Sequence, residues 1–191
     1  MKKNKKKLSV ILGICLFVTA VSILVWWIWN VNVSKERSEA YAESLLSLFP
    51  TPEGNIPEER ADNTMPTFSI DGTDFVGVLE FPRFNSKLPV GNEWGETHKY
   101  PCRFFGSVYD RTIQIGATTQ KGQIDFYREI SVGDSAIFVD LQGCMYSYTV
   151  SNLRYEKHAD KSALQKEEAD LVIFVKNIYA FEYLIIYCKA N

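Results

Sequence analysis

The chain has 191 residues, 21 of them basic and 23 acidic, which fits one domain with an appendage. Five lysines precede residue 8, so the remainder carries 16 basic against 23 acidic residues and a net charge of −7. This balance argues against nucleic acid as a partner, because binding to phosphates needs a basic face.

An apolar segment follows the basic tail. Residues 8–29 contain no charged side chain, and a helix of that length reaches about 33 Å, enough to cross a hydrocarbon core of about 30 Å. Aromatic rings favour the membrane interface, and three tryptophans close the segment: Trp26, Trp27 and Trp29. No small-residue cleavage site follows, and lysines precede the segment. We therefore expect a single-pass signal anchor in the cell membrane, with the N-terminus cytoplasmic and residues 30–191 extracellular.

The next segment, from Ser34 to Phe49, is predicted to be a stalk helix that packs on the domain. Ser34 can cap this helix, and Glu36 lies in its first turn, where the helix dipole favours an acidic side chain. Apolar side chains recur at helical spacing, at Ala40, Tyr41, Leu45, Leu48 and Phe49. The polar residues 50–66, with four prolines, then predict a linker.

From Thr67 onward, short apolar runs alternate with turn signals. Runs rich in Val, Ile, Tyr and Phe predict strands, at residues 75–81, 87–90, 112–116, 135–140, 145–152, 171–175 and 183–188. Short helices are expected at residues 122–130 and, with a clearer pattern, at 160–169. About eight strands in roughly 120 residues predict a mainly β fold, a closed or nearly closed barrel.

The cysteines predict no disulfide framework. Of Cys15, Cys102, Cys144 and Cys188, three lie outside the anchor, so at most one bridge can form. Pairing of Cys102 with Cys188 is one alternative that the sequence leaves open. No paired Cys/His spacing is present, so we expect no metal site, and no cofactor is predicted.

Five segments of the chain resemble successive motifs of the sortase family. GTDFVGVLEFPRFNSKLPV is similar to the strand that opens a sortase domain, and Trp94 with YPCRFFGS is similar to a segment of class B-like sortases. Gly133-Asp134, IFVDLQGCMYSYTV and LVIFVK…YLIIYC resemble later motifs, in the right order and spacing. The resemblance covers residues 67–191, nearly the whole ectodomain, and the anchor and stalk helix fit the family too. We therefore expect four parts: a cytoplasmic tail (1–7), a transmembrane anchor (8–29), a stalk helix and linker (30–66) and a sortase-like β-barrel (67–191).

The resemblance also implies a chemistry and the positions that perform it. Sortases are membrane-anchored cysteine transpeptidases of Gram-positive bacteria, in which a Cys thiolate attacks the sorting signal of a surface protein. A His transfers the proton, and an Arg donates to the substrate and its oxyanion. In this sequence the His position falls at Thr118, the Cys position at Lys176 and the Arg position at Tyr183. The resemblance therefore predicts a degenerate sortase, a catalytically inactive binding or accessory protein in surface-protein anchoring.

Two interpretations of the replaced positions stay open. They are either drift on a retired surface or a remodelled groove, in which Thr118, Lys176 and Tyr183, with nearby Tyr179, bind an extended peptide or its carboxylate. The partners implied by the resemblance are a surface-protein sorting peptide or an active sortase.

An active enzyme is the alternative hypothesis. A cysteine transpeptidase that joins a cleaved sorting signal to cell-wall or pilin amines would have to use Cys102 or Cys188. It would also need His98 or His158 within hydrogen-bond reach of that thiol. A third hypothesis is a structural subunit of a membrane complex that uses residues 34–49 as its contact.

Overall fold

The computed structural model describes residues 2–49, 64–95, 99–165 and 167–191. The chain divides into two compact units, Met1–Ser34 and Lys35–Asn191. The predicted linker lies largely in residues 50–63, which are outside the described residues, and so does His98. The four-part domain division stays a prediction.

A single helix, α1 (Lys2–Leu48), replaces the two helices that the sequence suggests. The predicted start at Ser34 is wrong, because the helix continues through that residue. No proline or glycine lies between Gly13 and Leu48 to interrupt it. Its Leu12–Leu48 part is long and apolar enough to cross a membrane, by length and composition.

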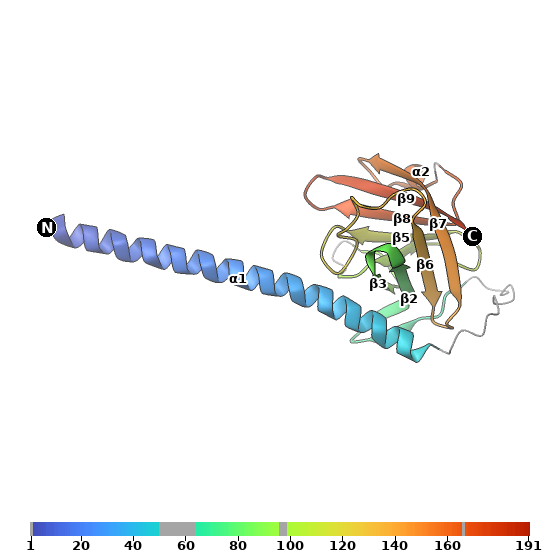
Figure 1. Cartoon of the computed structure of the whole chain (residues 1–191), viewed down its shortest axis with the longest axis horizontal. Helices are drawn as coiled ribbons and strands as arrows, with labels where there is room; N and C mark the ends of the chain where they lie inside the picture. Colours follow the sequence, from blue (N-terminus) through green and yellow to red (C-terminus); the bar gives the residue numbers. More distant parts are fainter. Residues whose placement is uncertain (1, 50–63, 96–98, 166) are drawn as a thin grey trace. The chain divides into compact units, whose positions relative to one another are not determined.

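Eight strands form a closed barrel within the described part of the chain, which confirms the predicted fold class. These strands are β2 (Thr73–Phe81), β3 (Ser86–Gly91), β4 (Cys102–Phe105), β5 (Ile113–Thr118), β6 (Ser135–Asp140), β7 (Met145–Glu156), β8 (Leu171–Asn177) and β9 (Glu182–Ala190). They pair in the order β2-β3-β4-β5-β8-β9-β7-β6, and pairing of β6 with β2 closes the ring (Figure 1). A further strand, β1 (Phe68–Ile70), pairs with β2 outside the ring.

The short elements differ most from the sequence prediction. The sequence does not predict strands β1 and β4, since each is short and has few buried residues. A 3-10 turn, η1 (Pro82–Phe84), follows β2. The expected helix over 122–130 is wrong: these residues form turns, and Gly122 has a φ of 84°. Of the helix expected over 160–169, a single turn exists, α2 (Lys161–Leu164).

Strand alternation divides the apolar side chains between the barrel interior and its outer face. Leu171, Ile173 and Val175 of β8 belong to the interior cluster, whereas Val172 and Phe174 belong to a second cluster on the outer face. This division follows from the two-residue period of a strand. The outer cluster is covered by α2, where Tyr187 Oη donates to the Ala163 carbonyl at 2.5 Å.

The end of α1 covers another part of the outer face, as the stalk prediction requires. Ala42 and Leu45 are fully buried in a cluster with Phe75 and Val78 of β2. Ser38 Oγ, also buried, donates to the Gly122 carbonyl at 2.8 Å. Residues from Lys35 onward therefore belong to the barrel unit.

Candidate functional site

Three of the four positions singled out in the sequence lie in one row across neighbouring strands. Lys176 on β8 is in register with Thr118 on the parallel strand β5 and with Tyr183 on the antiparallel strand β9. Lys176 has the same strand parity as Val172 and Phe174, whose side chains are on the outer face. The row therefore lies on the outer face of the barrel, at the end where β5 and β8 terminate.

Thr118 is held in place by the turn that follows it. The residue is 8% exposed, and its Oγ1 accepts a hydrogen bond from Gln120 N at 3.3 Å. Its own N–H donates to Gln123 Oε1 at 2.8 Å. Its hydroxyl thus accepts a hydrogen bond from the backbone of the turn that follows β5.

Lys176 and Tyr183 are half-buried, and Tyr179 is separate from them. The carbonyl of Lys176 accepts from Thr119 N at 3.1 Å, which ties the end of β8 to the turn that follows β5. The side chain of Lys176 supplies the cation of the row. The Tyr183 ring packs against Phe174, with ring centroids 6.4 Å apart. Tyr179 lies in the turn between β8 and β9 and is exposed.

An aromatic cluster adjoins the row. Phe174 contacts Trp94 and Phe104 edge to face, each with a centroid distance of 5.3 Å. The absence of a side chain at Gly116 makes room for this packing, because a Cβ there would lie 2.5 Å from Trp94 Cε3 and 2.6 Å from Phe174 Cζ. The missing side chain at Gly116 on β5 thereby allows the Trp94 ring to lie against the barrel surface.

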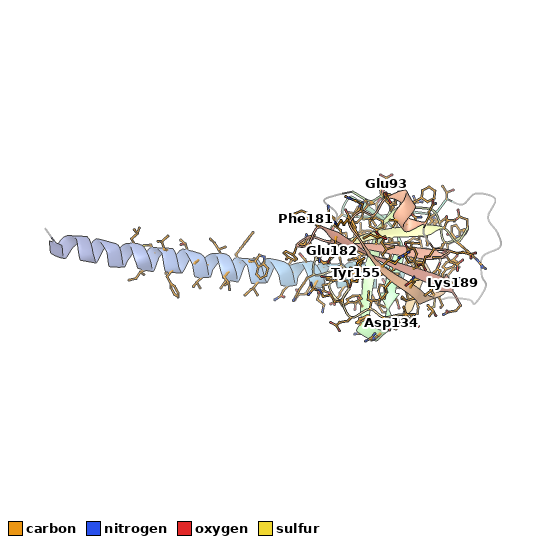
Figure 2. The ribbon with its side chains drawn as sticks, turned by 90° about the horizontal axis from the view of Figure 1, so that it is seen from above. Glu93, Asp134, Tyr155, Phe181, Glu182 and Lys189 are labelled. Atoms are coloured by element: carbon orange, nitrogen blue, oxygen red, sulfur yellow. The ribbon has the colours of Figure 1, made fainter. Side chains whose placement is uncertain are left out.

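An open cleft of about 600 Å³ continues from this cluster. It is lined by Asn92, Glu93, Trp94, Arg103, Phe104, Phe105, Gly106, Ser107 and Asp110, and Glu93 is labelled in Figure 2. Arg103 braces two of its walls: Nη2 donates to Asn92 Oδ1 at 2.9 Å, and Nη1 donates to the Gly106 carbonyl at 3.1 Å. The Arg103 cation, the aromatic surface of Trp94 and Phe104 and the concave shape of the cleft together suit an extended peptide.

No sequence pattern predicts the cleft. Trp94 and the segment containing Arg103 and Phe104 resemble sortase motifs, but nothing in the sequence indicates that they line a common surface. The available signal was Gly116, a glycine inside a buried strand, which indicates close approach of another group.

Cys102 and Cys188 lack the features of a catalytic nucleophile. Cys102 and Cys188 are free thiols, so they do not pair with each other. Burial raises the pKa of each of these two thiols to about 12, whereas a nucleophilic cysteine needs a lowered pKa. Cys188 belongs to the barrel interior, and Cys102 Sγ donates to the Tyr100 carbonyl at 3.3 Å.

His158 is an exposed residue beyond the end of β7. Cys102 lies on β4 and Cys188 lies on β9, so neither thiol is in the same segment as His158. Within the described residues, no group of three or more His, Cys, Asp or Glu side chains is arranged to hold a metal ion.

No protein-family model matches the sequence, and no curated protein resembles it significantly. Solved structures do resemble the fold. Sortase C from Clostridium perfringens SM101 is 17% identical, with a TM-score of 0.53 over 84% of this chain and 89% of that chain. Sortase C1 from Streptococcus agalactiae is 18% identical, with a TM-score of 0.52 over 86% and 89%.

The chain has the sortase fold. Sortase A from Corynebacterium diphtheriae adds a third likeness, 14% identical with a TM-score of 0.53 over 84% of this chain and 83% of that chain. At these identities the likeness establishes the sortase fold and leaves the chemistry to the residues of the site.

Proposed function

We propose that this chain is a membrane-anchored, extracellular protein of sortase fold that has no transpeptidase activity. We further propose that it binds a surface-protein sorting peptide as an accessory protein in surface-protein anchoring. Its partner would be that peptide or an active sortase of the same Gram-positive cell surface. The N-terminal apolar helix would hold it in the cell membrane.

The row of Thr118, Lys176 and Tyr183 carries this proposal. It lacks a thiol, an imidazole and a guanidinium at the three positions where the sortase resemblance implies them. An amine acylated at Lys176 would form a stable amide, and a threonine hydroxyl transfers no proton near neutral pH. Cys102 and Cys188 offer no substitute, because both are buried and protonated.

The aromatic cluster and the cleft support peptide binding by the same surface. One of the similar structures is Clostridium perfringens sortase C with the C-terminal cell wall sorting motif, 18% identical over 85% of this chain. In this chain, Trp94, Phe104 and Tyr183 would contact the apolar part of such a peptide. The half-buried Lys176 would then attract a carboxylate on it.

A transpeptidation assay of the full chain tests the loss of activity. The substrates are a quenched peptide with a C-terminal sorting motif and an amine acceptor. We expect no turnover, and we expect some to appear in the triple variant Thr118→His, Lys176→Cys, Tyr183→Arg, once circular dichroism shows that it folds. Thiol-sensitive turnover by the native chain would contradict the proposal and favour the active transpeptidase instead.

A binding assay tests the remaining half of the proposal. We expect the sorting peptide to bind the native chain, and Lys176→Gln to weaken binding about tenfold, as loss of one charge-assisted contact predicts. Lys189→Gln is the matched control, since Lys189 is exposed at the far end of β9 (Figure 2). Equal affinities of the two variants would show that Lys176 takes no part in binding.

A further inference from the structure

The turn between β8 and β9 exposes two large aromatic side chains. Tyr179 is 78% exposed and Phe181 is 85% exposed, the highest exposures among the large apolar side chains described in the barrel unit. We call residues Ile178–Phe181 the aromatic tip. Figure 2 shows Phe181, with Glu182 and Tyr155, toward one end of the barrel, and Lys189 toward the other.

Hydrogen bonds hold the backbone of the aromatic tip in place. Asn177, 3% exposed, accepts hydrogen bonds at its Oδ1 from Tyr179 N at 3.0 Å and from Ala180 N at 3.2 Å. Its Nδ2 donates to Tyr127 Oη at 3.1 Å. Phe181 has a φ of 51°, a left-handed conformation that a bulky residue seldom adopts. The fold thus presents two rings to solvent on a turn whose backbone is fixed.

The chain enters the barrel unit at the end that carries the aromatic tip. Ser38 of α1 bonds to Gly122, in the segment of turns that follows β5. That same segment holds the tip, through Tyr127 to Asn177 and through Thr119 to the Lys176 carbonyl.

The later part of α1 reaches the opposite end of the barrel. Tyr41 Oη donates to Asp71 Oδ2 at 2.5 Å, and Asp71 lies in the turn before β2. Because β2 ends at the η1 turn, beside the segment that follows β5, Asp71 marks the far end. Lys35, the first residue of the barrel unit, therefore lies at the tip end.

The covalent connection limits how far this end can be from a membrane. Five residues separate Trp29, the last residue of the expected span, from Lys35, and even a fully extended chain over these six Cα–Cα steps reaches only about 22 Å. This bound holds whatever the arrangement of the two units. Tyrosine and phenylalanine rings favour the membrane interface, where an apolar ring enters the acyl boundary.

We propose that the aromatic tip inserts into the interface of the bilayer that holds the anchor. The inference rests on the membrane anchoring in the proposed function. The tip's neighbours, Lys176 and Glu182, have opposite charges, so insertion would depend on the rings and not on anionic lipid. The contact would orient the barrel on its tether and hold the row of Thr118, Lys176 and Tyr183 at the membrane surface.

Lipid-depth fluorescence in nanodiscs tests this contact. The full chain, with Cys15→Ser and Cys144→Ser, receives a single environment-sensitive label at Ala180→Cys, since Ala180 is exposed between the two rings. The nanodiscs contain phosphatidylcholine with or without a spin-labelled phosphatidylcholine that quenches near the headgroups. We expect quenching of about twofold or more, and loss of that quenching when Tyr179→Ser and Phe181→Ser are added.

Two controls separate this proposal from the anchoring itself. A label on the native Cys15, in nanodiscs whose phosphatidylcholine carries the spin label deep in the acyl chain, reports on the anchor. A label at Met145→Cys reports on an exposed residue at the end of the barrel opposite the tip. Quenching at Cys15 without quenching at position 180 would overturn the tip contact and leave the anchor intact. Equal quenching at positions 180 and 145 would overturn it as well, and no quenching at Cys15 would refute the anchor first.

Discussion

Asp140 is a fully buried side chain that organises the turn between β6 and β7. Its Oδ1 accepts from the backbone N–H groups of Gln142 and Cys144, each at 2.9 Å. Its Oδ2 accepts from Tyr109 Oη at 3.2 Å and from Tyr146 Oη at 3.4 Å. One carboxyl group therefore satisfies four donors, which ties the turn to the barrel wall.

We expect Asp140→Ala to destabilise the protein by about 3 kcal/mol, because buried donors lose their acceptor and each unsatisfied group costs about 1–3 kcal/mol. Urea unfolding of the full chain in detergent measures this. Asp125→Ala is the control at an exposed aspartate, with an expected change within about 0.5 kcal/mol. A loss no larger than that of the control would show that other groups define the turn.

The buried thiols give a second prediction at the scale of single residues. With a pKa of about 12, Cys102 and Cys188 hold about 1,000-fold less thiolate near pH 8 than a thiol with the usual pKa of 9.0. We expect iodoacetamide to leave both unmodified in the folded chain and to modify both in urea. Mass spectrometry of the peptides measures this, and rapid modification of either thiol in the folded state would revive the active-enzyme hypothesis.

At the scale of elements, the last part of α1 behaves as a component of the barrel. Leu45 is fully buried against β2, whereas Leu48, one turn later on the same helix, is 59% exposed. The two leucines allow the same substitution to be made at a packed and at a solvated position.

We expect Leu45→Ala to lower the free energy of unfolding by about 2–4 kcal/mol, because it removes buried methyl groups and leaves a cavity. Leu48→Ala should change it by no more than about 0.5 kcal/mol. Denaturant unfolding of both variants measures the difference. Similar values for the two would mean that α1 contributes little to the stability of the barrel.

For the whole molecule, buried acidic groups predict a loss of stability at alkaline pH. Burial raises the pKa of Cys102, Cys188 and Tyr100 to about 12, above the usual 9.0 for cysteine and 10.0 for tyrosine. Between the usual pKa of each group and about pH 12, the folded state keeps protons that the unfolded state releases. Stability is therefore fully present below about pH 9 and falls as the pH rises toward 12.

Unfolding midpoints in urea, measured from about pH 7 to pH 11, test this sign, and each group adds a slope of up to about 1.4 kcal/mol per pH unit. We expect the slope to be smaller in Cys188→Ala, which removes one of these groups. A midpoint that does not move with pH, or a slope unchanged in the variant, would argue that these groups ionise equally in both states.

Local sequence patterns were sufficient to predict much of the fold. Runs of Val, Ile, Tyr and Phe located most of the strands, and charge-free residues 8–29 located the apolar helix. The resemblance to sortase motifs gave the fold and the positions Thr118, Lys176 and Tyr183. These features can be seen in sequence because the side-chain period of a strand and the length of an apolar run are local properties.

Contacts between residues that are distant in the chain decided how the site and its surroundings are arranged. The shared row of Thr118, Lys176 and Tyr183 depends on the register of three strands, two of them more than 50 residues apart in the chain. The cleft depends on Trp94 meeting Gly116 and Phe174, and the end at which the chain enters depends on Ser38 bonding to Gly122. The sequence by itself therefore determined which segments form strands and what chemistry the site has lost. Tertiary structure alone decided what lies beside that site, because strand register and side-chain packing arise from contacts between residues that no local pattern links.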